Sequence, residues 1–360
     1  MQRIGFYISS LGSGGAERVC CSLSGMLSNR NEYCYVSTSV GRDSDFYSLE
    51  KSVHREELNF YYGSSMLRKA LEVFVKLVKT QASIRRNKPD VIVAMCSSEI
   101  IKQVLVKKIF LNKYKIISCE HNNYYAVKGL KRKLRDWAMK NSDFSIVLTE
   151  KDYFEYRQKG IFTEVIPNPN HLQIIKDAKS LSDSEVLNIV MIGRLTKQKG
   201  YDHLLKIAKL IKRHSVRKMK IRIYGEGALE EHIRTQILSQ GLSEVVELCG
   251  VTHNVLDVYQ AADLYIMTSN YEGLPMTLIE ASSQGIPCIC FDCDTGPRQI
   301  LKGANNSLVP CFDYEMFFKK LQEVTTNKAL YREMSSESLH SAKYFEPGEI
   351  LNKWEEILER

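Results

Sequence analysis

The chain has 360 residues, of which 44% are hydrophobic and 26% charged, and its formal net charge is +8. This composition is that of an ordinary globular protein, and it excludes a low-complexity chain. No apolar run approaches the roughly 20 residues that span a bilayer, and the first residues read as a strand rather than as a secretory signal. We therefore expect a cytoplasmic protein, and its length predicts two domains rather than one core.

Ten cysteines are scattered along the chain. Without an export signal we expect them to be reduced and mostly buried. Cys290 and Cys293 have zinc-like spacing, but no second pair of similar spacing accompanies them,. We therefore expect no metal at this pair.

The first half of the chain alternates between extended and helical patterns. The expected strands are residues 3–9, 33–39, 91–96, 115–119 and 144–149. One expected helix follows the first strand and ends near residue 29, and a second covers residues 66–86. A turn containing Gly14 and Gly15 follows the first strand and would let a ligand approach the backbone closely. His121 follows the strand 115–119, at the end where open α/β sheets bind ligands, although a lone histidine is often structural.

A basic window runs from Lys102 to Lys140. It contains eleven lysines and arginines but only two acids, Glu120 and Asp136. Such a window indicates an anionic partner (a membrane surface, a phosphorylated lipid or nucleic acid) or simply a solvated face. Within it, apolar residues recur at helical spacing, which suits an interfacial helix as well as a core-packed helix with a basic outer side. They are Leu130, Leu134, Trp137 and Ala138.

The second half repeats the alternation after two closely spaced prolines, Pro167 and Pro169. The expected strands are 186–192, 219–224, 245–248, 262–267 and 286–291, and the main expected helices are 201–214, 255–261, 276–283, 314–327, 330–343 and 347–359. Arg194 and Lys199 flank a loop after the strand 186–192. Their cations suit a pyrophosphate, with arginine as a fork and lysine as a point charge.

Two carboxylates bracket the turn before the helix 276–283. Glu272 precedes the turn and Glu280 lies on the helix, with seven residues between them. Helical spacing can place Glu280 on the side of the helix that carries its N-terminus. The pair then suits a polyhydroxylated ligand, while the alternative is one carboxylate at a helix start and one surface glutamate.

Two successive βα repeats predict an α/β protein with two doubly wound domains that face each other across a cleft. We place the domains at 1–168 and 169–346, with the last helix, 347–360, packing back on the first domain.

Four motifs in this order resemble a known family: Gly14-Gly15-Ala16-Glu17-Arg18, Gly193-Arg194 with Lys199-Gly200, Gly225-Glu226-Gly227, and Glu272-Gly273-Leu274-Pro275 with Glu280. The chain resembles the retaining glycosyltransferases of family 4, which have the GT-B fold of two Rossmann-like domains across a deep cleft. The segment 291–298 further resembles bacterial members that build O-antigens, capsules and other surface glycans.

The resemblance implies roles for the candidate residues. Arg194 and Lys199 would bind the diphosphate of the donor and stabilise the leaving group. Glu272 would hold the hydroxyls of the donor sugar, and Glu280 those of the ribose. Gly14 and Gly15 would lie beside the diphosphate and the acceptor, and His121 near the reacting sugar carbon. Backbone N–H groups in the segment Gly273, Leu274, Pro275 and Met276 would assist Glu272. Gly193 is a further implied site residue.

The resemblance also implies the partners. The donor would be a UDP-sugar and the acceptor a lipid-linked (polyprenyl diphosphate) glycan, with no metal cofactor and no nucleic acid. The basic window 102–140 would attach the protein peripherally to the anionic inner face of the plasma membrane. A nucleotide-sugar epimerase or phosphorylase of the same fold would add acid–base carboxylates in the first domain, where no clear pair is found. A non-catalytic nucleotide-sugar-binding protein would be expected to lack Arg194, Lys199 or Glu272.

Overall fold

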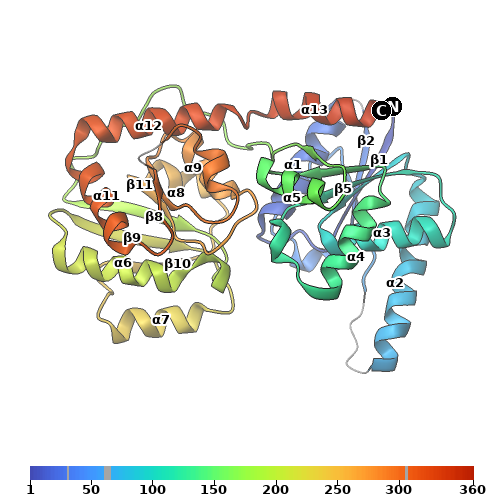
Figure 1. Cartoon of the computed structure of the whole chain (residues 1–360), viewed down its shortest axis with the longest axis horizontal. Helices are drawn as coiled ribbons and strands as arrows, with labels where there is room; N and C mark the ends of the chain where they lie inside the picture. The colour runs from blue at the N-terminus through green and yellow to red at the C-terminus, as the bar shows by residue number, and fades with distance from the viewer. Residues whose placement is uncertain (31, 61–65, 305–306) are drawn as a thin grey trace. The chain divides into compact units, whose positions relative to one another are not determined.

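A computed structural model describes residues 1–30, 32–60, 66–304 and 307–360. These residues form two compact units (Figure 1). Unit 1 comprises Met1–Pro169 and Gly348–Arg360, and unit 2 comprises Asn170–Pro347. Each unit is an α/β structure on a parallel sheet, as the alternating pattern predicts.

The sheet of unit 1 has seven strands in the order β3-β2-β1-β4-β5-β6-β7. All neighbouring strands pair in parallel. Both β1 and β4 lie in the interior of the sheet, and β4 is buried along its whole length, as expected for a strand covered on both faces,. The strands are β1 (Arg3–Ile8), β2 (Tyr33–Thr38), β3 (His54–Glu57), β4 (Val91–Met95), β5 (Lys115–Glu120), β6 (Phe144–Val147) and β7 (Glu164–Val165).

The helices of unit 1 are α1 (Gly15–Ser28), α2 (Met66–Asn87), α3 (Ser97–Ile109), α4 (Gly129–Lys140), α5 (Glu150–Gln158) and α13 (Pro347–Glu359), with 3-10 turns η1 (Arg42–Ser44) and η2 (Tyr124–Ala126). Helices α2 to α5 share one core cluster with the sheet. Helix α13 ends beside the start of β1, where Gln2 Nε2 donates to the carbonyl oxygen of Leu358 at 3.0 Å. A salt bridge of 3.4 Å between Arg30 and Glu355 holds the same helix to the end of α1.

The sheet of unit 2 has six strands in the order β10-β9-β8-β11-β12-β13. Its pairs are parallel too, so the carboxyl ends of β9, β8, β11 and β12 meet at one edge. The strands are β8 (Val186–Ile192), β9 (Lys218–Tyr224), β10 (Val246–Gly250), β11 (Leu264–Met267), β12 (Cys288–Phe291) and β13 (Leu308–Val309).

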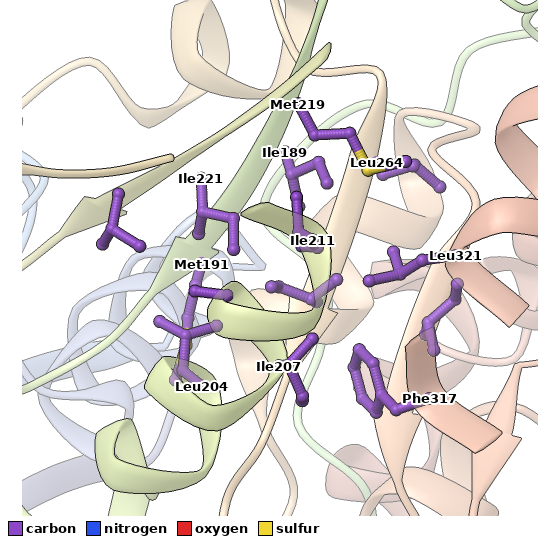
Figure 2. Packing of buried hydrophobic residues seen from close by; sticks show 14 of the residues in the cluster. Ile189, Met191, Leu204, Ile207, Ile211, Met219, Ile221, Leu264, Phe317 and Leu321 are labelled. Atoms are coloured by element: carbon purple, nitrogen blue, oxygen red, sulfur yellow. The ribbon is translucent and has the colours of Figure 1, made fainter. Parts of the chain in front are cut away.

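The helices of unit 2 are α6 (Tyr201–His214), α7 (Glu230–Ser239), α8 (Val255–Gln260), α9 (Met276–Ser283), α10 (Pro297–Ile300), α11 (Tyr314–Thr326) and α12 (Lys328–Lys343), with one 3-10 turn, η3 (Lys197–Lys199). Figure 2 shows how α6 and α11 pack against the sheet. Leu204, Ile207 and Ile211 recur on one face of α6 and meet Ile189 and Ile221 of the strands,. This core fixes the strand ends that carry the candidate site.

The cations of the basic window 102–140 do not all lie on one solvated face, which was one expectation from the sequence. Arg135 of α4 is fully buried, so this cation faces the interior of unit 1. In contrast, Leu130, Leu134 and Trp137 are exposed, at 73%, 43% and 36%. The sequence left two alternatives for this helix, an interfacial helix or a helix whose apolar stripe packs in the core. The second alternative is wrong, because of Leu130, Leu134, Trp137 and Ala138 only Ala138 is buried. No helix within the described ranges is both long and apolar enough to cross a bilayer.

Candidate active site

Close backbone packing shapes the edge of the unit 2 sheet. Gly193 N–H donates to the carbonyl of Tyr224 at 2.9 Å, which joins the loops after β8 and β9. A Cβ on Gly225, whose φ is +143°, would lie 2.1 Å from the carbonyl oxygen of Gly193. Only glycine allows the two backbones to approach so closely. This contact fixes the start of the loop that carries Arg194 and Lys199.

The second half of that loop is held against the segment after β11. Gly200 has a φ of +67°, and a Cβ there would lie 2.1 Å from the carbonyl oxygen of Thr268. Thr268 Oγ1 donates in turn to the carbonyl of Gly200 at 3.1 Å. Asn270 N–H donates to the carbonyl of Gln198 at 2.8 Å. The η3 turn and residues 268–272 therefore form one surface, although they lie far apart in the sequence.

On this surface Lys199 and Glu272 form an ion pair. Lys199 Nζ lies 2.7 Å from Glu272 Oε1, and the two side chains are only 13% and 5% exposed. A charge-assisted hydrogen bond in such a partly buried place is stronger than a solvated surface pair. The structure thus brings together a cation and a carboxylate that the sequence placed in separate motifs.

Glu272 has further partners that were not predicted. Ser269 Oγ donates to Oε1 at 2.6 Å, and Gln198 Nε2 lies 3.3 Å from Oε2. The backbone N–H of Glu272 donates to the carbonyl of Asp294 at 3.2 Å, and Thr295 Oγ1 donates to the carbonyl of Glu272. Both oxygens of the carboxylate are thereby fixed in direction. A sequence signal existed only for Ser269, three residues before the glutamate, and for Gln198, next to the lysine.

Arg194 lies on the same loop as Lys199 but differs in its surroundings. Its side chain is exposed, and within the described ranges it forms no salt bridge or hydrogen bond. Its five N–H donors are therefore available to a ligand, and a guanidinium matches the geometry of phosphate oxygens.

The N-terminus of α9 lies directly after Glu272. Pro275 is the N-cap residue of this helix, and Gly273, Leu274 and Met276 are all buried. Among the described residues, the N–H groups of Gly273, Leu274 and Met276 have no hydrogen-bond acceptor. Unpaired N–H groups at the positive end of a helix attract anions and polar oxygens.

Glu280 is buried on the same helix, so the alternative of a solvated surface glutamate is wrong. Tyr259 Oη of α8 donates to Glu280 Oε2 at 2.9 Å. His171 Nδ1 lies 3.5 Å from Oε1. Both partners were missed, because Tyr259 and His171 belong to other segments and carry no motif.

In unit 1, the glycine-rich turn leads into α1. Gly14 is the N-cap residue, and Gly15 begins the helix and is exposed. A Cβ on Gly14 would lie 2.1 Å from Glu17 Oε2, so glycine leaves room for this carboxylate. The carboxylate of Glu17 therefore lies against the backbone of Gly14 at the start of the helix.

His121 follows the end of β5, as expected. Neither ring nitrogen has a hydrogen-bond partner within the described residues. Burial lowers the pKa of His121 to about 4, so the ring is neutral at physiological pH,. The preceding Glu120 is buried, accepts from Ser97 Oγ and the N–H of Asn122, and has a pKa that burial raises.

Two short patterns in unit 2 contain residue types that bind metals, Asp292-Cys293-Asp294 and the pair Cys290 and Cys293. Asp292 is paired with Arg298, and Asp294 uses its carbonyl oxygen to accept from Glu272. Cys290 and Cys293 are both buried. Across the described ranges, no three His, Cys, Asp or Glu side chains gather where they could hold a metal ion.

Residues 173–340 match the family of Glycosyl transferases group 1. This segment is a group 1 glycosyltransferase domain. It contains Arg194, Lys199, Glu272 and Glu280, while His171, the partner of Glu280, lies just before it.

The similarity extends over the whole chain in three comparisons. The chain is 28% identical to the amylovoran biosynthesis glycosyltransferase AmsD of Erwinia amylovora, with 96% of each chain covered. It is 26% identical to an α-1,4-N-acetyl-D-galactosaminyltransferase of Campylobacter jejuni that acts on a GalNAc-containing diNAcBac-PP-undecaprenol, with 99% and 98% covered. A TarM structure from S. aureus, solved with fondaparinux, α-GlcNAc-glycerol and UDP, superposes with a TM-score of 0.82 at 14% identity and covers both chains completely. The two parallel-sheet units therefore have the GT-B fold.

Proposed function

We propose that this glycosyltransferase is a retaining enzyme of the family 4 type. It transfers a hexosyl or N-acetylhexosaminyl group from a UDP-sugar to a lipid-linked glycan in the synthesis of a bacterial surface polysaccharide. The observation that carries the proposal is the Lys199–Glu272 pair at the carboxyl edge of the group 1 domain, on the same loop as Arg194, whose guanidinium pairs with no described residue. UDP in the TarM structure supports the nucleotide.

The donor is held at both ends by unit 2. Arg194 and Lys199 bind the diphosphate, whose negative charge grows as the bond to the sugar breaks. Glu272 accepts from hydroxyls of the sugar, and the N–H groups of Gly273 and Met276 donate to it. Glu280 accepts from the ribose hydroxyls while Tyr259 keeps the carboxylate in place.

The chemical step is a substitution at the anomeric carbon of the donor sugar. The bond from this carbon to the β-phosphate oxygen breaks, and a bond to the acceptor oxygen forms on the same face. The proton of the acceptor hydroxyl passes to the departing phosphate oxygen. Two cations that are in place before the reaction stabilise the leaving diphosphate without reorganisation, and this is the main contribution of the protein. Glu272 and Glu280 then serve as ligands of the donor, unlike the acid and base of a glycoside hydrolase.

The acceptor end belongs to unit 1. We propose that the backbone of Gly14 and Gly15 and the neutral ring of His121 contact the acceptor. The Campylobacter relative acts on an undecaprenyl diphosphate-linked glycan, which supports an acceptor of this class. With such an acceptor, we propose that the reaction takes place at the inner face of the plasma membrane.

The proposed reaction needs no divalent metal. Arg194 and Lys199 supply the positive charge that a metal ion supplies in other nucleotide-sugar sites. Transfer should therefore continue at an unchanged rate in excess chelator, and a strict requirement for Mg²⁺ or Mn²⁺ would contradict this part of the proposal.

The deciding experiment is a donor screen that measures released UDP. Purified protein is incubated with a panel of UDP-sugars, with and without a lipid-linked or synthetic acceptor. The expected result is UDP release from one donor that increases with acceptor, together with an α-linked product. Epimerised donor without UDP release would indicate an epimerase, and binding without any turnover a non-catalytic protein; either result would overturn the proposal.

A further inference from the structure

The outer side of α4 carries an apolar stripe that the described residues of unit 1 leave partly exposed. Leu130, Leu134 and Trp137 are 73%, 43% and 36% exposed. Their spacing of four and three residues places them on one line along the helix. A contiguous exposed stripe of large apolar side chains costs solvation free energy and marks an interaction surface more often than a stray surface residue does.

The charges of α4 are sorted between its two sides. Its one acid, Asp136, faces inward, where it accepts from Arg135 at 2.8 Å and from Tyr124 Oη at 3.0 Å. Arg135 is itself fully buried and lies over the rings of Tyr124 and Tyr156. The exposed side therefore carries cations without any acid of the same helix.

The outward cations frame the stripe. With 3.6 residues per turn, Lys133 and Lys140 lie along one edge of the stripe and Lys131 lies along the other. All three are exposed. We call Leu130, Leu134 and Trp137 with these three lysines the α4 face. It has the residue pattern of a helix that lies in the plane of a membrane surface.

The neighbouring helix extends this surface. Helices α3 and α4 lie side by side (Figure 1). Lys108 Nζ, near the end of α3, lies 6.0 Å from the centre of the Trp137 ring. The next residue, Ile109, is 56% exposed, and Leu111 in the following turn is 83% exposed. A second helix end thus adds the same combination of exposed apolar and positive side chains.

We propose that the α4 face docks on a lipid bilayer that contains anionic headgroups. Its lysines would lie among the headgroups, while Leu130, Leu134 and Trp137 enter the boundary between headgroups and acyl chains. The proposal goes beyond the transfer reaction and does not depend on it, because docking needs neither donor nor acceptor.

The same face is less suited to nucleic acid. Phosphate contacts need cations and polar donors, and single-stranded bases need aromatic platforms. Here two leucines occupy the middle of the positive face, and only one aromatic side chain accompanies them. Aliphatic side chains between lysines match a membrane surface, where charged headgroups lie next to apolar acyl chains.

The first test is flotation of the full chain with vesicles in the absence of substrates. Vesicles of phosphatidylcholine alone are compared with vesicles that also contain phosphatidylglycerol. Binding is expected only with phosphatidylglycerol, and it should fall at least tenfold between about 0.01 M and about 1 M salt, as the Debye length falls from about 30 Å to about 3 Å. Equal binding to both vesicles, or none to either, would overturn the proposal. So would binding to duplex DNA without binding to vesicles.

Two sets of variants separate the charges from the stripe. Lys131→Glu, Lys133→Glu and Lys140→Glu together should weaken binding to anionic vesicles by at least about a hundredfold. Leu130→Ser, Leu134→Ser and Trp137→Ser together should weaken it by at least about tenfold. The matched control reverses three exposed cations of unit 2, Arg213→Glu, Lys319→Glu and Lys343→Glu, and should bind as the wild type does. Equal loss in the control would show that net charge alone drives binding and would refute the α4 face.

Tryptophan fluorescence reports insertion directly. The chain has two tryptophans, and Trp354 is buried in α13 at 4% exposure. The emission that is lost in Trp137→Phe therefore reports the α4 face. On anionic vesicles this emission should shift to the blue and be quenched by brominated acyl chains. Binding without either change would contradict insertion. Donor hydrolysis, measured separately without lipid, should be unchanged in all α4 variants, so a failure of docking can be distinguished from a failure of catalysis.

Discussion

Lys199 Nζ and Glu272 Oε1 lie 2.7 Å apart, although the two residues are 73 positions apart in the sequence. The pair joins the loop after β8 to the loop after β11, and its side chains are nearly buried. A cation and a carboxylate are thus oriented before any donor arrives. Preorganised charge of this kind loses little free energy to rearrangement during the reaction.

We predict that Lys199→Ala and Glu272→Ala each lower kcat/KM by at least about 10²-fold while the protein stays folded. The double variant should lose less than the product of the two single losses, because either single change already breaks the pair. Released UDP measures the rates, and circular dichroism checks the fold. Lys197→Ala, an exposed cation of the same loop, is the control and should retain its activity. Near wild-type rates in both single variants would remove these residues from the site.

Ser269 should act through Glu272. Its hydroxyl donates to the carboxylate at 2.6 Å, and a hydrogen bond to a charged group contributes about 1.5–3 kcal/mol,. We expect Ser269→Ala to lower kcat/KM by about tenfold or more, and Ser269→Thr to restore most of the loss because it keeps the hydroxyl. If both variants behave alike, the hydroxyl does not position the carboxylate.

These contacts show what the sequence could predict and what it could not. The strand ends, the helix 276–283 and the order of the motifs follow from apolar patterns and glycines, which act locally. The partners Tyr259 and His171 of Glu280 come from separate segments, and only the fold brings them together. The edge strands β3, β7 and β13 were missed, because they have two to four residues and no long apolar run. The burial of Arg135 was missed too, since lysines and arginines on either side of it suggested a solvated face.

Arg194 offers a contrast to Lys199. Its exposed side chain pairs with no described residue, so its removal should leave stability unchanged within about 0.5 kcal/mol,. We expect Arg194→Ala to lower kcat/KM by about 10²-fold or more through the donor diphosphate. Arg194→Lys should recover only part of this loss, because an ammonium lacks the fork geometry. Competition by free UDP tests the site of action: its Ki should rise in Arg194→Ala, and an unchanged Ki would place the effect elsewhere.

Arg135 should matter for stability rather than for membrane docking. It is buried, donates to Asp136 and to the carbonyl of Tyr124, and lies over two aromatic rings. Removing one partner of a buried ion pair leaves an uncompensated charge, so we expect Arg135→Ala to lower the free energy of unfolding by about 3–5 kcal/mol. Lys133→Ala on the exposed side of the same helix is the control and should change it by less than about 0.5 kcal/mol. Urea unfolding measures both, and similar values would contradict the burial of Arg135.

His121 should make stability depend on pH. Burial lowers its pKa from 6.5 to about 4 in the folded protein. Between these values the unfolded chain binds more protons than the folded one, so the free energy of unfolding falls as the pH falls from 6.5 towards 4. From about pH 7 to about pH 5, the wild type should lose about 1–2 kcal/mol more than His121→Gln, which has no titrating ring. Glu120 and Asp152, whose pKa values burial raises, act in the opposite direction but are present in both proteins. Urea unfolding at the two pH values measures the difference, and equal losses in the two proteins would show that the ring of His121 is accessible to protons in the folded state.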